Sequence, residues 1–150
     1  MKMYRLHHEL WIPRPIDEVY SFFADARNLE RITPHWLHFE ATSAPAAIQL
    51  GSKIDYRLRI HGIPIRWQSE ISAWDPPTRF IDTQTIGPYR RWIHEHTFAV
   101  RDGGTMVHDD VQYAPRGGWL VNRLLVARDL KRIFNYRRDR LEALLSQQDG

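Results

Sequence analysis

Apolar and polar residues alternate over the first segment of the chain, and the period then changes to that of a helix. Every second side chain from Tyr4 to Ile12 shares one face, which predicts a strand with one buried side. Pro15 suits the first turn of a helix, and the apolar residues of Ile16–Phe23 follow at helical spacing. A second short helix is predicted over Ala26–Ile32, because Pro34 restricts the residue before it.

The middle of the chain returns to a period of two and predicts further strands. They begin with a short one at Leu37–Ala41 and continue over Ile54–Ile60, Ile65–Ala73, Arg79–Ile86, Arg91–Val100 and Thr105–Tyr113. Short turns rich in Gly, Pro and Asp separate most of them, the tightest being Asp102-Gly103-Gly104. Connections this short favour antiparallel pairing, so we expect one antiparallel sheet of about seven strands.

A long helix is predicted after the Gly-rich segment Pro115–Gly118. Its apolar stripe consists of Leu120, Leu124, Ala127, Leu130, Phe134, Leu141 and Leu144, widened by Ile133 and Leu145. The predicted helix is rich in Arg and Leu and has no internal Gly or Pro, which favours a long helix. A strand, two short helices, further strands and a long helix make an α+β order. We therefore predict one domain over residues 1–150, in which the helix covers the concave face of the sheet.

Composition narrows the classes of function. The chain holds no cysteine, which excludes disulfides, thiol catalysis and Cys-based zinc sites and fits a cytoplasmic protein. A formal net charge of +3 is mild and does not indicate nucleic acid. We find no apolar stretch long enough for a membrane-spanning helix. Motifs for phosphate binding, a nucleophile elbow or a zinc protease are absent, so no cofactor is expected.

The predicted strand Arg91–Val100 carries the most informative polar residues. Its period places His94 and His96 on the same face as Trp92 and Phe98, and these aromatic residues mark the inner face. Neighbouring strands and the apolar stripe of the helix bring further polar side chains to the same place. The candidate polar patch consists of Asp82, Gln84, His94, His96, Asp109 and Arg137.

Three interpretations of this patch stay open. The polar groups satisfy one another as a buried network, because burial without partners is costly. Alternatively, they form the polar end of a ligand site. In the third interpretation His94 and His96 chelate a metal ion, with Asp82 or Asp109 as a third ligand. His-x-His on a strand is a sound chelating geometry, and imidazole suits zinc, copper or iron.

Local patterns along the whole chain resemble those of one known superfamily. They are Ile12-Pro13-Arg14-Pro15, Ile32-Thr33-Pro34-His35-Trp36-Leu37, Trp74-Asp75-Pro76-Pro77, Gly87-Pro88-Tyr89, Trp92-Ile93-His94-Glu95-His96 and Ile133-Phe134-Asn135-Tyr136-Arg137. With the order of elements, they resemble the START-like (SRPBCC) superfamily with its helix-grip fold, and within it bacterial polyketide cyclase/dehydrase-like proteins.

The resemblance implies a ligand cavity between a curved sheet and the C-terminal helix. The expected wall and cap consist of Tyr56, Leu58, Trp67, Ile71, Phe80, Trp92, Phe98, Tyr113, Leu130 and Phe134. The polar patch would complete the ligand site at one end. Trp36 and the turn Gly87–Tyr89 are expected at the rim.

Three functions follow as expectations. The first is carriage or sequestration of a small apolar or amphipathic ligand, aromatic ones included. The second is a cyclase or dehydrase in which His94 or His96 acts as general base. Asp82, Asp109 or Arg137 would orient that base or stabilise an enolate.

The third expected function is an interaction module that uses the basic face of the C-terminal helix. The basic residues are Arg116, Arg123, Arg128, Lys131, Arg132, Arg138 and Arg140. They could meet anionic lipid or nucleic acid, although a solvated helix face is the simpler explanation. Nucleic acid is disfavoured, because the face lacks interleaved aromatic residues suited to base stacking.

Overall fold

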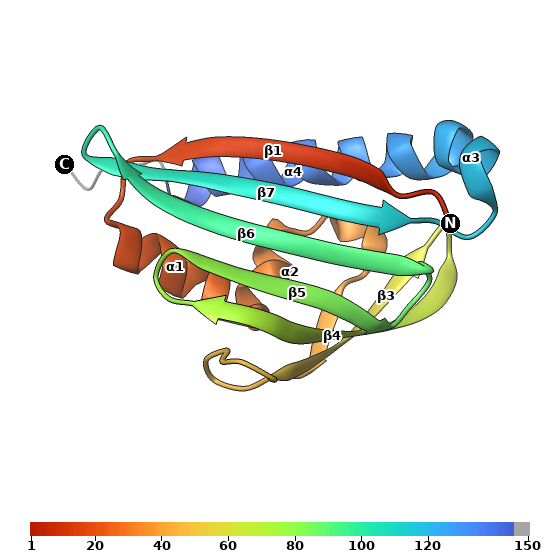
Figure 1. Cartoon of the computed structure of the whole chain (residues 1–150), viewed down its shortest axis with the longest axis horizontal. Helices are drawn as coiled ribbons and strands as arrows, with labels where there is room; N and C mark the ends of the chain where they lie inside the picture. The colour runs from red at the N-terminus through yellow and green to blue at the C-terminus, as the bar shows by residue number, and fades with distance from the viewer. Residues whose placement is uncertain (146–150) are drawn as a thin grey trace.

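Seven antiparallel strands form one curved sheet in the computed structural model, which describes residues 1–145 (Figure 1). The strands are β1 (Tyr4–Ile12), β2 (Glu40–Ser43), β3 (Lys53–Ile60), β4 (Ile63–Asp75), β5 (Arg79–Ile86), β6 (Arg91–Arg101) and β7 (Gly104–Ala114). Their order across the sheet is β1-β7-β6-β5-β4-β3-β2. Each strand from β2 onward pairs with the next along the chain, and β1 pairs with β7. This confirms the predicted α+β fold.

Helices cover one face of this sheet. Between β1 and β2 lie α1 (Ile16–Ala24), the 3-10 turn η1 (Ala26–Asn28), α2 (Leu29–Ile32) and the 3-10 turn η2 (His35–Leu37). After β7 come α3 (Gly118–Val121), the π-helical turn η3 (Asn122–Val126) and α4 (Ala127–Leu145). Figure 1 shows α4 extending along β1 and β7. Within residues 1–145, none of these helices has the length and apolar character needed to cross a membrane.

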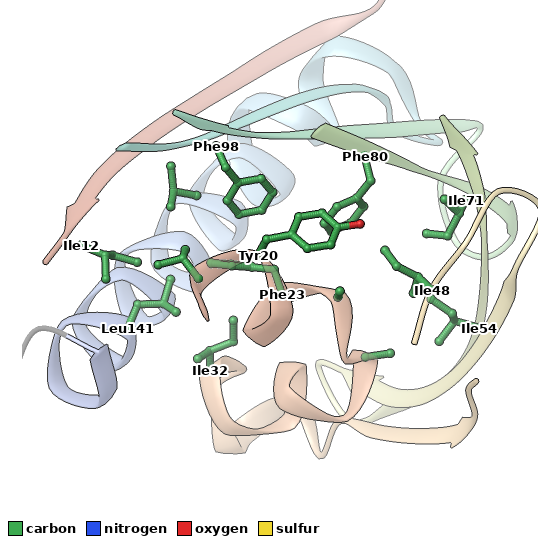
Figure 2. Close-up of a cluster of buried hydrophobic side chains, with 14 of the residues drawn as sticks. Ile12, Tyr20, Phe23, Ile32, Ile48, Ile54, Ile71, Phe80, Phe98 and Leu141 are labelled. Atoms are coloured by element: carbon green, nitrogen blue, oxygen red, sulfur yellow. The ribbon is translucent and has the colours of Figure 1, made fainter. Parts of the chain in front are cut away.

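The helices and the sheet bury two apolar clusters. In the first, Tyr20 of α1 meets Phe80 and Phe98 edge to face, with ring centroids 6.1 and 5.6 Å apart (Figure 2). Leu141 of α4 belongs to this cluster as well. The second cluster consists of Trp92, Val111, Tyr113, Leu130 and Phe134. Because α4 contributes to both clusters, it is anchored to the sheet at two places along its length.

The prediction that a strand begins at Leu37 is wrong. Leu37 ends the turn η2 and is buried. The next residue, His38, has a φ of 48°, in the left-handed region, which an extended strand does not adopt. The strand β2 therefore starts only at Glu40.

The predicted apolar stripe of the C-terminal helix is buried along α4 but not at its start. Leu120 and Leu124 are 51% and 56% exposed. The π-helical turn Asn122–Val126 holds more residues per turn than an α-helix and so changes which side chains face the sheet. Asn122 faces inward instead, and its side-chain oxygen accepts a 2.8 Å hydrogen bond from the Tyr113 hydroxyl.

Replacing Phe98 with Ala should lower the free energy of unfolding by about 3–5 kcal/mol, because it leaves a hole beneath Tyr20. Val100 on the same strand is 71% exposed, so Val100→Ala should change that free energy by less than about 0.5 kcal/mol. Urea unfolding of the two variants measures both values. Equal losses would show that the cluster around Phe98 does not hold α1 to the sheet.

Candidate functional site

A cavity of about 660 Å³ lies between the sheet and the helices. Strands β3, β4 and β6 contribute Tyr56, Trp67 and Trp92 to its wall, and α4 contributes Leu130 and Phe134. Pockets for small organic molecules measure about 300–1,000 Å³ and are mostly apolar with a few polar groups. The volume and the lining therefore suit a small ligand.

Most residues predicted for the ligand site line this cavity. They are Tyr56, Leu58, Trp67, Asp82, Trp92, His94, His96, Leu130, Phe134 and Arg137. Of the residues expected at the rim, Trp36, Pro88 and Tyr89 line it as well. The inner faces of the strands were thus placed correctly by their period of two.

Six other predicted residues do not line the cavity, which corrects the expected wall. They are Ile71, Phe80, Gln84, Phe98, Asp109 and Tyr113. Ile71, Phe80 and Phe98 belong to the first cluster, in which Tyr20 of α1 packs against the rings of Phe80 and Phe98. Gln84 turns to the loop after β5 and exchanges hydrogen bonds of 2.8 and 3.2 Å with the backbone of Tyr89. The Tyr113 hydroxyl donates a hydrogen bond to Asn122 of η3, and Asp109 is hydrogen-bonded to His94 Nε2.

Four strand residues and one helix residue form a buried polar group, which we call the His–Asp cluster. Its members are Asp82 of β5, His94 and His96 of β6, Asp109 of β7 and Arg137 of α4. In the strand register Asp82 lies opposite His94, and Asp109 lies opposite His96. The hydrogen bonds run diagonally: His96 Nε2 to Asp82 Oδ2 is 2.7 Å, and His94 Nε2 to Asp109 Oδ1 is 2.8 Å. The two imidazole rings stack with centroids 3.7 Å apart.

Arg137 completes the cluster from the helix side. Its Nη2 lies 3.5 Å from Asp109 Oδ1, and its guanidinium lies over the rings of Phe23 and Phe134. Nε and Nη2 are buried and make no hydrogen bond. Because this arginine also lines the cavity, donors of Arg137 remain for an acceptor that enters there.

Within the His–Asp cluster, the pKa values of the members are shifted from their ordinary values in different directions. Burial lowers the pKa of His94, and the neighbouring His96 lowers it further. Burial opposes protonation of His96 too, but the carboxylates of Asp109 and Asp82 outweigh it and raise the pKa of His96. Burial acts to raise the pKa of Asp82, yet the bond to His96 and nearby positive charges lower it. The pKa of Asp109 lies well below its usual range, because Arg137 and the histidines outweigh burial.

Two groups within residues 1–145 bring three metal-ligating side chains together. Asp82, His94 and His96 each offer one ligand atom, all within 4.8 Å of one another, and they line the cavity. The second group, on the outer face of β1 and β7, consists of His7, Glu9 and His108. Asp109, the other predicted third ligand, instead bonds the far side of His94.

Sequence reasoning missed lining residues at the end of α2 and in the turn between β3 and β4. Ile32 and Thr33 at the end of α2 line the cavity. His61, in the turn between β3 and β4, lies 2.8 Å from the Asp129 carboxylate of α4 through its Nε2, and both residues line the cavity. Alternation along a strand identifies its inner face, but no local pattern shows where a turn meets a distant helix.

Replacing Asp109 with Asn should lower the free energy of unfolding by about 3–5 kcal/mol, because it leaves the buried side chains of Arg137 and His94 without their carboxylate partner. Asp110 is the matched control, since its partner Arg5 is exposed. Asp110→Asn should cost at most about 1 kcal/mol. Urea unfolding separates the two, and a similar small loss for both variants would contradict a coupled buried cluster.

Most of the chain matches a known protein family. The family model described as "Polyketide cyclase / dehydrase and lipid transport" matches residues 12–142. A search of curated proteins finds no match.

Solved structures share the fold at low sequence identity. The Zhui aromatase/cyclase from Streptomyces sp. R1128 is 15% identical with a TM-score of 0.74, covering 95% of this chain and 93% of that one. Protein Ms6760 from Mycobacterium smegmatis is 19% identical with a TM-score of 0.73, covering 97% and 93%. Major latex-like protein 151 from Panax ginseng is 14% identical with a TM-score of 0.69, covering 94% and 96%. The chain therefore belongs to the polyketide cyclase/dehydrase and lipid transport family, within the START-like (SRPBCC) superfamily.

Proposed function

We propose that the protein binds and carries a small amphipathic ligand that has an aromatic or other apolar body and one polar group. The observation that carries this proposal is the asymmetry of the cavity. The His–Asp cluster supplies polar groups on one part of its wall, and aromatic and aliphatic side chains supply most of the rest. A purely apolar guest would leave the donors of Arg137 unmet, which is unfavourable in a buried site.

The polar group of the ligand is proposed to be an acceptor such as a carboxylate, a hydroxyl or a carbonyl oxygen. Arg137 has two buried nitrogens without a hydrogen bond, and a guanidinium is only a donor. An oxygen that reached them would be close to Asp109, which already takes part of the positive charge. These contacts support one anchored oxygen at this end.

The apolar body is proposed to lie against Trp67, Tyr89 and Trp92. Trp67 and Trp92 meet edge to face with centroids 5.3 Å apart, and Tyr89 lies 4.9 Å from Trp92. Trp67 has its indole N–H engaged by the Ser69 hydroxyl at 3.0 Å, so it offers the cavity no free donor. Aromatic walls of this kind favour flat apolar guests.

A cyclase or dehydrase reaction is the second candidate. Its support is that two imidazoles, each held by a carboxylate, reach the cavity wall. It takes second place because both Nε2 atoms are already engaged. Conversion of a polyketone, lost in a His94→Gln, His96→Gln variant that still binds it, would move the reaction to first place. A cytoplasmic location stays a prediction.

The amphipathic aromatic anion 8-anilinonaphthalene-1-sulfonate serves as a defined test ligand. We expect its fluorescence to rise on binding to the folded protein. Leu58 is buried and lines the cavity, so Leu58→Trp should fill part of the space and weaken binding by at least about 10-fold, or about 1.4 kcal/mol.

Val100→Trp adds the same side chain at an exposed position outside the cavity and is the control. It should bind the dye as the unmodified protein does. Near-UV circular dichroism checks that each variant keeps its tertiary packing. Equal affinity in all three proteins would place the dye outside the cavity and count against the proposal.

A further inference from the structure

We propose that Asp82, His94 and His96 form a binding site for one divalent transition-metal ion, such as Zn²⁺, on the wall of the cavity. The three side chains each bring one ligand atom to within 4.8 Å of the others. Two imidazoles and one carboxylate are a donor set that zinc and iron accept. This function goes beyond ligand carriage and rests on different atoms from those proposed to anchor the ligand.

The sheet holds these three side chains close to the geometry that a metal needs. Asp82 Oδ2 lies 2.7 Å from His96 Nε2 and 3.9 Å from His94 Nδ1. Ligands about 2.0–2.1 Å from a tetrahedral zinc ion lie about 3.4 Å from one another. The two separations lie on either side of that value. The stacked rings of His94 and His96 would turn on binding so that Nδ1 of one and Nε2 of the other point at the same ion.

Asp109 is placed to orient the two histidines through the ring nitrogens that would not bind the metal. Its Oδ1 lies 2.8 Å from His94 Nε2, so that nitrogen carries the hydrogen and Nδ1 keeps its lone pair on the side of Asp82. Metal-binding histidines almost always donate their other N–H to a carboxylate, a carbonyl or a water.

The carboxylate of Asp109 is also close to His96 Nδ1, which makes no hydrogen bond in the structure. Nδ1 of His96 is buried without a hydrogen bond and lies 3.4 Å from Asp109 Oδ1. A metal ion on Nε2 would take the place of the hydrogen that now bonds Asp82. The imidazole hydrogen would then sit on Nδ1 and face Asp109. One carboxylate would thus orient both histidine ligands.

The buried charges also leave room for a cation. Asp82 and Asp109 carry two negative charges when ionised, and Arg137 supplies one positive charge. With neutral histidines the charges of the His–Asp cluster sum to −1. Protonation of His96, which both carboxylates favour, or a bound cation in place of that proton would balance this charge. A divalent ion and one anionic oxygen from the cavity would bring the sum to zero. Because the three ligands line the cavity, a further coordination position would open toward it.

The experiment titrates Zn²⁺ into protein first freed of metal by a chelator, in competition with a chromophoric chelator. We expect one tightly bound Zn²⁺ per chain, and visible absorption bands when Co²⁺ replaces it. Asp82→Asn and His96→Gln each remove a ligand. They should weaken binding by about 100-fold or more, since loss of a supporting residue alone costs about 10–100-fold.

The outer group provides the control for surface binding. The double variant His7→Gln, His108→Gln removes two of its three ligands and should keep the full affinity for Zn²⁺. If Asp82→Asn or His96→Gln does not fold, ¹⁵N imidazole shifts of the unmodified protein decide. Zinc should move the signals of His94 and His96. Absence of tight binding, shifts confined to other histidines, or loss of binding only in the outer double variant would overturn the proposal.

Discussion

Two diagonal hydrogen bonds between the histidines of β6 and the aspartates of β5 and β7 allow four polar side chains to be buried on the inner face of the sheet. They run from His96 to Asp82 at 2.7 Å and from His94 to Asp109 at 2.8 Å. Histidine and aspartate are costly to bury alone, and pairing makes their place in the sheet tolerable. The inner face of β5, β6 and β7 is therefore polar at its centre, and aromatic and aliphatic side chains of the two apolar clusters lie on either side.

The helix α4 packs against the sheet on both sides of the polar centre. Leu141 packs in one apolar cluster, and Leu130 and Phe134 pack in the other. Between these contacts Arg137 reaches the polar centre of the sheet, where it lies 3.5 Å from Asp109. Arg137 lines the cavity next to the aromatic residues Trp67 and Trp92, so the cavity has aromatic walls and one charged, hydrogen-bonded region.

Much of the fold and of the site could be predicted because strand alternation is regular here. The period of β6 alone placed Trp92, His94 and His96 on the inner face, and all three line the cavity. The stripe of the last helix likewise brought Arg137 to the cluster. Gln84 shares the period of Asp82, but the loop after β5 engages its side chain.

The errors arise where the backbone leaves a regular period. The π-helical turn Asn122–Val126 changed the phase of the helix, so Leu120 and Leu124 face solvent. The left-handed His38 delayed the start of β2. Distant contacts such as that between His61 and Asp129 have no local signature at all. Periodicity thus identifies the inner faces of regular strands and helices. It does not identify the lining residues that come from turns and irregular segments.

The most direct test is a crystal structure of the protein grown with 8-anilinonaphthalene-1-sulfonate. The account predicts that the naphthalene rings lie against Trp67 and Trp92 inside the cavity and that the sulfonate approaches Arg137. A dye bound only on the outer face of the sheet, or a cavity closed by movement of α4 onto β6, would contradict it.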